Sequence, residues 1–263
     1  MRNFAAAAAL LSLVWIGQSA LATTGYPNYN GPDVSFTGIQ ETSSFGDPEP
    51  LFGAPTGSGN SLLFFPPNFT ATTSGAGGSD STGAQLQATM LATSASTIDI
   101  LNFNEYGDAT LIGPANAGTG VFAGLSGFVT VLEVNGLPIT TPLVIGFNAG
   151  GLVNGSFTPG TLGTAGLDRI SNPGTTLWSG NLSIDIGAAL IGAGLQPKAT
   201  KVALSLDNDL YAYTAAAGNS AKIQKKVVDG PAIIIDVIPE PGTFALLCGG
   251  LALMSLRARG RRA

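Results

Sequence analysis

The chain has 263 residues, with 11 Lys and Arg against 16 Asp and Glu, no histidine, and one cysteine, Cys248. Metal and cofactor sites that need several Cys or His ligands are therefore excluded, as are His-based catalytic triads. Between residues 23 and 240 there are six bases and sixteen acids, a net charge of −10. Such a segment repels nucleic acid, which excludes DNA and RNA as partners.

The first 22 residues have the pattern of a secretory signal peptide. Arg2 precedes an apolar run of residues 4–16, and Ala20 and Ala22 form a small-x-small cleavage site. The run is shorter than the roughly 20 residues that span a bilayer, so we expect cleavage rather than anchoring. The mature chain is then expected to begin at Thr23.

The segment from residue 23 to 237 has the composition of an exported β-protein. Only 10% of the whole chain is charged, and 37 residues are glycine, which is typical of many short strands and turns. In its first half the sequence predicts strands over residues 34–39, 61–65, 85–91 and 97–103. The stretch 71–83 is rich in Gly, Ser and Thr, and we interpret it as a flexible loop.

The second half contains three predicted turns between strands. Asn135-Gly136 predicts a hairpin between residues 128–134 and 139–147. Asp207-Asn208-Asp209 is interpreted as a polar turn between 202–206 and 210–213, and Asp229-Gly230-Pro231 as a hairpin between 223–228 and 232–237. A further strand is expected over 177–186, and three glycines argue against a helix over 187–194. The pattern predicts an all-β fold, an antiparallel β-sandwich of the jelly-roll type, over residues 23–237.

Few residues of this domain suggest chemistry. Asp207 and Asp209 lie two apart, so their carboxylates could contribute to a calcium site, although a polar turn between strands is the more frequent role of such a sequence. Trp178, Tyr211 and Tyr213 could stack on sugar rings, whereas burial is the more frequent fate of a strand tryptophan. Paired carboxylates could also hydrolyse glycosides. Lys222, Lys225 and Lys226 are interpreted as a solvated edge that keeps sheets apart.

The C-terminus has three ordered parts. Ile238, Pro239, Glu240 and Pro241 form an extended segment that resists helix formation. Residues 242–256 carry no charge and can form a short membrane-inserted helix, and the basic end that follows is expected to stay in the cytoplasm, with Arg257, Arg259, Arg261 and Arg262. Fifteen helical residues reach only about 22 Å, which suits transient insertion in the inner membrane better than a durable anchor.

These three parts resemble the PEP-CTERM sorting signal of Gram-negative bacteria, with residues 238–263 as the signal. The resemblance implies recognition by an exosortase, cleavage near residues 239–241, and delivery to the cell surface or the extracellular matrix. It also implies association with exopolysaccharide and biofilm. The expected function is thus that of a non-enzymatic surface or matrix protein without a cofactor. The alternatives are a lectin-like carbohydrate-binding sandwich and a polysaccharide-acting enzyme.

Overall fold

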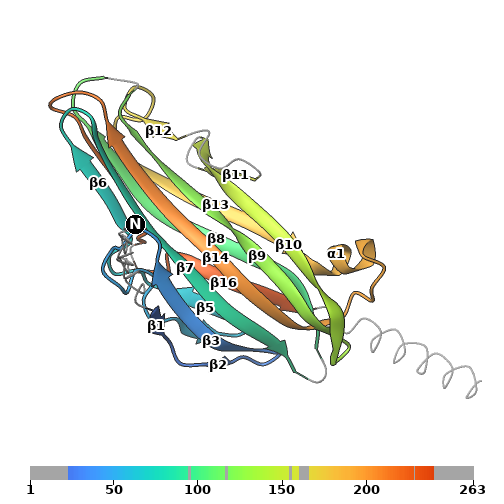
Figure 1. Ribbon diagram of the computed structural model, residues 1–263. Coiled ribbons are helices and arrows are strands. Elements are labelled where there is room, and N and C mark those ends of the chain that lie inside the picture. The colour runs from blue at the N-terminus through green and yellow to red at the C-terminus, as the bar shows by residue number, and fades with distance from the viewer. Residues whose placement is uncertain are drawn as a thin grey trace, which may run out of the picture.

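The computed structural model describes residues 23–93, 96–115, 118–153, 156–159, 166–227 and 229–239. Over these residues the strands form one continuous sheet of sixteen strands, which curls on itself into two facing layers (Figure 1). The predicted all-β class and the antiparallel, sandwich-like arrangement are confirmed. The predicted signal peptide, residues 1–22, and the predicted sorting tail from residue 240 onward lie outside the described residues.

One layer, called here the front layer, has the strand order β1-β3-β7-β14-β9-β10, with β2 paired to β3 and β12 paired to β9. Its strands are β1 (Thr23–Gly25), β2 (Tyr29–Asn30), β3 (Val34–Ser43), β7 (Gly78–Ala92), β9 (Gly120–Val134), β10 (Leu137–Val153), β12 (Leu167–Asp168) and β14 (Ala199–Thr214). The central strand β14 is paired along nearly its full length with β7 on one side and β9 on the other.

The back layer is built around β8, which pairs with β13 on one edge and with β15 and β16 on the other. Its strands are β4 (Thr56–Ser58), β5 (Ser61–Phe64), β6 (Thr70–Ser74), β8 (Ile98–Ile112), β13 (Gly174–Asp185), β15 (Ser220–Gln224) and β16 (Ile233–Pro239). The short strand β11 (Ser156–Pro159) connects the layers, because it pairs with β10 and, through Ser156 opposite Ser179, with β13.

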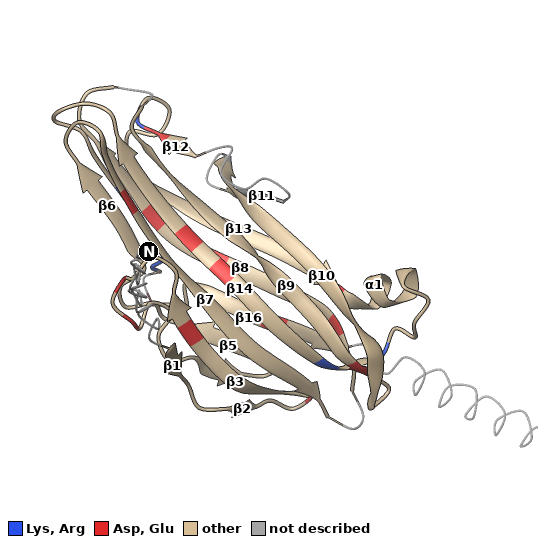
Figure 2. Cartoon of the chain, in the orientation of Figure 1, with Lys and Arg blue, Asp and Glu red and all other residues tan. Residues whose placement is uncertain are grey.

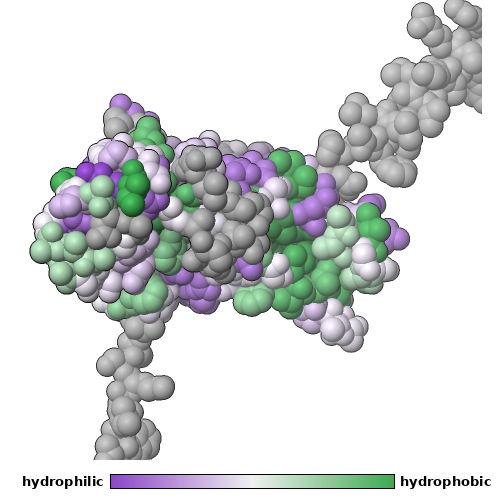
Figure 3. Space-filling view, turned by 90° about the horizontal axis from the view of Figure 1, so that it is seen from above, coloured by the Kyte–Doolittle hydropathy of each residue, from purple (hydrophilic) through white to green (hydrophobic). Residues whose placement is uncertain are grey.

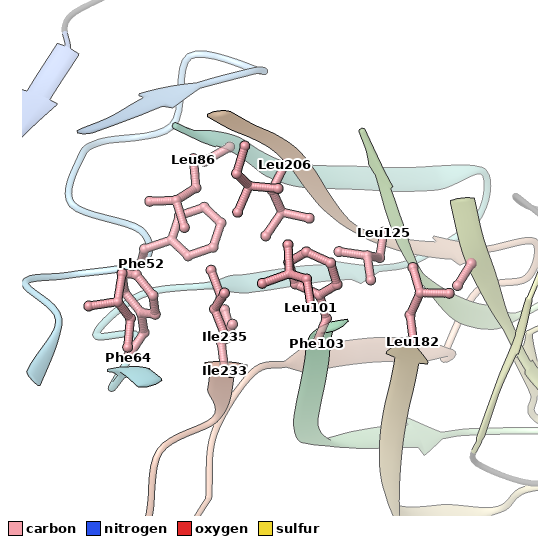
Figure 4. Close-up of a cluster of buried hydrophobic side chains, with 14 of the residues drawn as sticks. Phe52, Phe64, Leu86, Leu101, Phe103, Leu125, Leu182, Leu206, Ile233 and Ile235 are labelled. Atoms are coloured by element: carbon pink, nitrogen blue, oxygen red, sulfur yellow. The ribbon is translucent and has the colours of Figure 1, made fainter. Parts of the chain in front are cut away.

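The core lies between the two layers. Leu86, Leu125 and Leu206 of the front layer point toward Phe103 and Ile235 of the back layer (Figure 4). Buried and more exposed residues alternate from Leu101 onward in β8 and from Val202 onward in β14, since successive side chains of a strand point to opposite faces, and this alternation produces the arrangement. Truncating one such leucine to alanine typically costs 2–5 kcal/mol in unfolding free energy, roughly, because a cavity remains.

The predicted hairpin at Asn135-Gly136 is confirmed. Both residues have positive φ, 53° and 74°, as the two central positions of a type I′ turn require. β9 and β10 run antiparallel from Val134 opposite Leu137.

Two loop predictions are wrong. The Gly/Ser/Thr-rich stretch 71–83 is not a flexible loop, because β6 and the first part of β7 occupy it. Short side chains are compatible with these strands, because pairing with β15 fixes the backbone of β6 and pairing with β14 fixes that of the first part of β7. The hairpin predicted around Asp229-Gly230-Pro231 does not form either. β15 and β16 lie one after the other along the same edge of β8, opposite residues 108–112 and 98–105.

A helix forms where glycine content argued against one. The helix α1 (Ile186–Gly192) begins after Asp185, whose carboxylate accepts a hydrogen bond from Ala188 N at 2.6 Å and caps the helix. Ile186 and Leu190, one turn apart, are both buried, and this packing outweighs the glycines. Among the described residues no helix is long and apolar enough to cross a membrane.

Candidate functional site: an aromatic strip on the front layer

The sequence Asp207-Asn208-Asp209 is part of a continuous strand, which corrects the predicted turn. β14 runs without interruption from Ala199 to Thr214. Alternation along it directs Asn208 into the interior, where the residue is fully buried, and places Asp207, Asp209, Tyr211 and Tyr213 on the outer face. The two acids and two tyrosines named from the sequence therefore form one row of half-buried side chains on the outer face of β14.

Three aromatic rings lie together in this row and its neighbour. Tyr211 and Tyr213 are stacked, with ring centroids 5.8 Å apart and an angle of 26° between their planes. Phe122 of β9 lies directly opposite Tyr211, with centroids 5.2 Å apart and the rings tilted by 43°. We call Phe122, Tyr211 and Tyr213 the aromatic strip. Phe122 is a member that the sequence alone did not identify, because strand pairing brings it in.

The residues that flank the aromatic strip are small. Ser81 and Ser79 of β7 lie opposite Tyr211 and Tyr213. On the other side Gly120 of β9 lies opposite Tyr213, and a Cβ atom at this glycine would come within 2.7 Å of the Tyr213 hydroxyl oxygen. The absence of a side chain at Gly120 is thus what allows the Tyr213 ring to lie across the sheet beside it.

Acidic groups continue the row beyond the rings, and Figure 2 shows acidic positions in red running across the middle strands of the front layer. The Asp207 carboxylate accepts a hydrogen bond from Gln85 Nε2 at 3.2 Å. Partial burial raises the pKa of Asp209, while the charge of Lys225 in the interior acts in the opposite direction. The strip therefore combines apolar rings with oxygen acceptors on one face.

A hollow of about 570 Å³ opens beside Asp207, and its walls come from β9, β10 and β13. The lining is mixed, with polar groups from Ser126, Asn148 and Asp207 and apolar groups from Phe128, Phe147 and Leu182. Seen from above, apolar side chains gather toward the end of the molecule that carries α1 (Figure 3). Phe128 of β9 and Val144 of β10 are each more than half exposed.

The carboxylates of Asp207 and Asp209, which were considered as calcium ligands, lie on one face of β14. Within the described ranges no three Asp, Glu, His or Cys side chains converge on a point, whereas calcium takes six to eight oxygen ligands. Calcium binding at Asp207 and Asp209 therefore stays a prediction.

Trp178 does not lie with the tyrosines. It is on β13 of the back layer and is only 3% exposed, so its ring faces are covered by protein. The Nζ atom of Lys225 lies 5.7 Å from the centre of this ring. Only Tyr211 and Tyr213 of the three predicted glycan contacts are accessible on one surface.

The prediction for Lys225 is also wrong. It was expected on a solvated edge, but its side chain is fully buried and contacts Glu105 and Asn208. Lys226 next to it is exposed and Lys222 is half-buried, so the three lysines share no common surface.

The predicted processing motif lies at the boundary of the described residues. Ile238 and Pro239 are the last residues of β16 and pair with Ile100 and Ile98 of β8, so the sheet continues two residues past the expected end of the domain at residue 237. Glu240, Pro241 and the arginine cluster lie outside the described residues, as do Ala20 and Ala22.

No protein-family model matches this chain, and no curated protein matches its sequence. Among solved structures, the comparison gives "Structure of infectious bursal disease virus Gt strain", with 13% identity and a TM-score of 0.11. The match covers 77% of this chain and 52% of that one, so the chain spans about half the length of the viral protein. A TM-score this low carries no argument about fold or function.

Proposed function

We propose that this chain is a non-enzymatic exported protein of the cell surface or extracellular matrix, and that it holds polysaccharide on the aromatic strip of its front layer. The observation that carries the proposal is the row of Tyr211 and Tyr213 with Phe122 beside them and Asp207 and Asp209 on the same face. For the curled sheet we propose the jelly-roll-like class of sandwich that the sequence favours.

The chemistry of the row suits sugars. The faces of pyranose rings carry C–H groups that pack against aromatic rings, while their hydroxyls need acceptors such as carboxylates and amides nearby. The small residues Ser79 and Ser81 beside the rings leave space for an extended polymer. With a net charge of −10 between residues 23 and 240, the domain favours neutral over acidic polysaccharides.

The two ends of the chain support the delivery part of the proposal. The signal peptide pattern with Ala20 and Ala22, and the motif from Ile238 to Pro241 with its arginine-rich end, favour export and exosortase processing. Mass spectrometry of the protein taken from its native host tests this. We expect a mature chain that lacks residues 257–263, and an intact C-terminus on the surface protein would overturn the processing step.

A binding screen tests the glycan part. The exported protein is passed over immobilised neutral and acidic polysaccharides, including the exopolysaccharide of the host, and we expect retention on at least one neutral polymer. Absence of retention on every polymer would leave a purely structural matrix protein. Turnover of a retained polymer, abolished by one carboxylate substitution, would instead identify an enzyme.

A further inference from the structure

Three polar side chains from three different segments meet in the interior of the sandwich. Glu105 belongs to β8, Asn208 to β14, and Lys225 directly follows β15. None of the three is more than 1% exposed. Lys225 Nζ donates to Glu105 Oε2 and to Asn208 Oδ1, and Asn208 Nδ2 donates to Glu105 Oε1. Each side chain therefore contacts both others, and the glutamate touches the amine and the amide at once.

The surroundings of this cluster are apolar. Lys225 Nζ lies 5.1 Å from the ring centre of Phe69 and 5.7 Å from that of Trp178. Asn208 is flanked on its strand by Leu206 and Leu210, which are fully buried. Burial lowers the pKa of the Lys225 amine, because an ammonium group loses its hydration there. A lysine in such a place becomes a competent nucleophile, since the neutral amine carries the reactive lone pair.

We propose that Lys225 and Asn208 react to form an intramolecular isopeptide bond, with Glu105 transferring the protons. The lone pair of Lys225 Nζ attacks Asn208 Cγ, and the Nζ–Cγ bond forms as the Cγ–Nδ2 bond breaks. The Glu105 carboxyl group accepts a proton from Nζ and delivers one to Nδ2, which leaves as ammonia. One amine and one carboxamide become one secondary amide and one ammonia, so no oxidant, reductant or cofactor takes part.

The fold holds the reacting groups in place. β14 ends at Thr214, and the chain returns as β15 in the opposite layer, so that residues 17 apart in sequence face each other across the core. Fixing two reactants in contact replaces a bimolecular encounter by a step within one molecule, which is worth orders of magnitude in rate. Glu105 is placed by β13 and β16, which pair with β8 on either side of it.

The bond would give this domain a covalent tie between its layers. Between residues 23 and 239 the sequence contains no cysteine, so a disulfide is unavailable to this part of an exported chain. An ion pair that stayed unreacted would instead keep two desolvated charges in the core, which is costly compared with an apolar replacement.

Mass spectrometry of the whole expressed chain, denatured after purification, tests the proposal. We expect a mass lower than the sequence requires by one ammonia, about 17 Da. After trypsin digestion we expect a branched peptide in which residues 202–222 are joined to residues 223–226, because trypsin does not cleave after an acylated Lys225. A full sequence mass together with separate peptides 202–222 and 223–225 would overturn the proposal.

Two variants distinguish the isopeptide bond from other reactions that release ammonia. Glu105→Gln keeps the shape and both reacting residues but removes the proton carrier, so we expect the unbranched peptides. Lys226→Gln changes the neighbouring exposed lysine, and the branched linkage should persist. A Glu105→Gln chain that remains fully branched would overturn the role of Glu105. The wild-type peptide map decides whether the bond exists even if a variant fails to fold.

Discussion

Tyr211 and Tyr213 stack on the outer face of β14, with their ring centroids 5.8 Å apart. Residues two apart on a strand share a face, so this pairing follows directly from the extended backbone. The stack depends on neighbours as well as on the strand, because the ring of Tyr213 lies beside Gly120 and that of Tyr211 beside Phe122. A substitution on the adjacent strand β9 can therefore disturb the stack although both tyrosines are unchanged.

Gly120→Ala should displace Tyr213. The added methyl group would lie 2.7 Å from the Tyr213 hydroxyl oxygen and 2.5 Å from the Leu167 carbonyl oxygen, both too close. We expect a loss of roughly 1–3 kcal/mol in unfolding free energy from this overpacking, together with weaker polysaccharide binding. Urea denaturation and the binding screen measure the two effects. A variant with wild-type stability and binding would show that Tyr213 does not need the space.

Glu41→Ala should destabilise the domain strongly. The Glu41 carboxylate is fully buried and accepts hydrogen bonds from the backbone N–H groups of Leu51 at 2.6 Å and Phe52 at 2.9 Å. Its removal leaves two buried donors without their acceptor, at a cost of about 3 kcal/mol. Urea denaturation at neutral pH measures the change.

The matched control for Glu41 is Glu133→Ala. Glu133 pairs with Lys201 at 3.5 Å on the surface, where their side chains are 22% and 38% exposed. An exposed ion pair of this kind contributes less than about 1 kcal/mol. Equal losses in the two variants would contradict the role given to the buried carboxylate.

Asp209→Asn should stabilise the fold at neutral pH and not in acid. Burial raises the pKa of Asp209 above its ordinary value of 3.8, and the charges of Asp207 and Glu105 raise it further. The charge of Lys225 opposes this shift only while its amine is unreacted, so the direction is the same in both forms. The pKa of Asp209 is higher in the folded protein than in the unfolded chain, so between these two values the folded state binds more protons. The free energy of unfolding therefore falls as the pH rises through this range. Asparagine cannot ionise, so the variant does not lose stability in this way as the pH rises.

Urea denaturation of wild type and Asp209→Asn at pH 7 and at a pH below 3.8 tests the sign. We expect the variant to be the more stable at pH 7 and the difference to vanish in acid. A variant that is less stable than wild type at pH 7 would mean that the carboxylate takes part in a favourable contact.

Alternation of apolar residues was enough to predict the all-β class and most strands. It failed at Asp207-Asn208-Asp209, because a polar residue stands on the buried face between Leu206 and Leu210 and so imitates a turn. The same alternation could have identified the buried polar residue of β8. Continuing the inward face of β8 from Leu101 and Phe103 places Glu105 in the core, and a buried glutamate requires a partner.

The partner itself could not be predicted from local sequence. Lys225 is 120 residues from Glu105 along the chain and stands beside the exposed Lys226, so nothing local distinguishes the two lysines. Phe122 likewise joins the aromatic strip only because β9 pairs with β14 in one register. Long-range pairing decided these contacts.

The proposed binding of polysaccharide on the aromatic strip is tested most directly by the affinity of the protein for the exopolysaccharide of its host, measured by titration calorimetry for three chains. The first two are wild type and the double variant Tyr211→Ala/Tyr213→Ala. The third is the control Tyr106→Ala, whose tyrosine is 38% exposed on β8 of the back layer. We predict at least a tenfold loss for the double variant, about 1.4 kcal/mol, and wild-type affinity for the control. Equal affinity in all three chains would contradict the assignment of the aromatic strip.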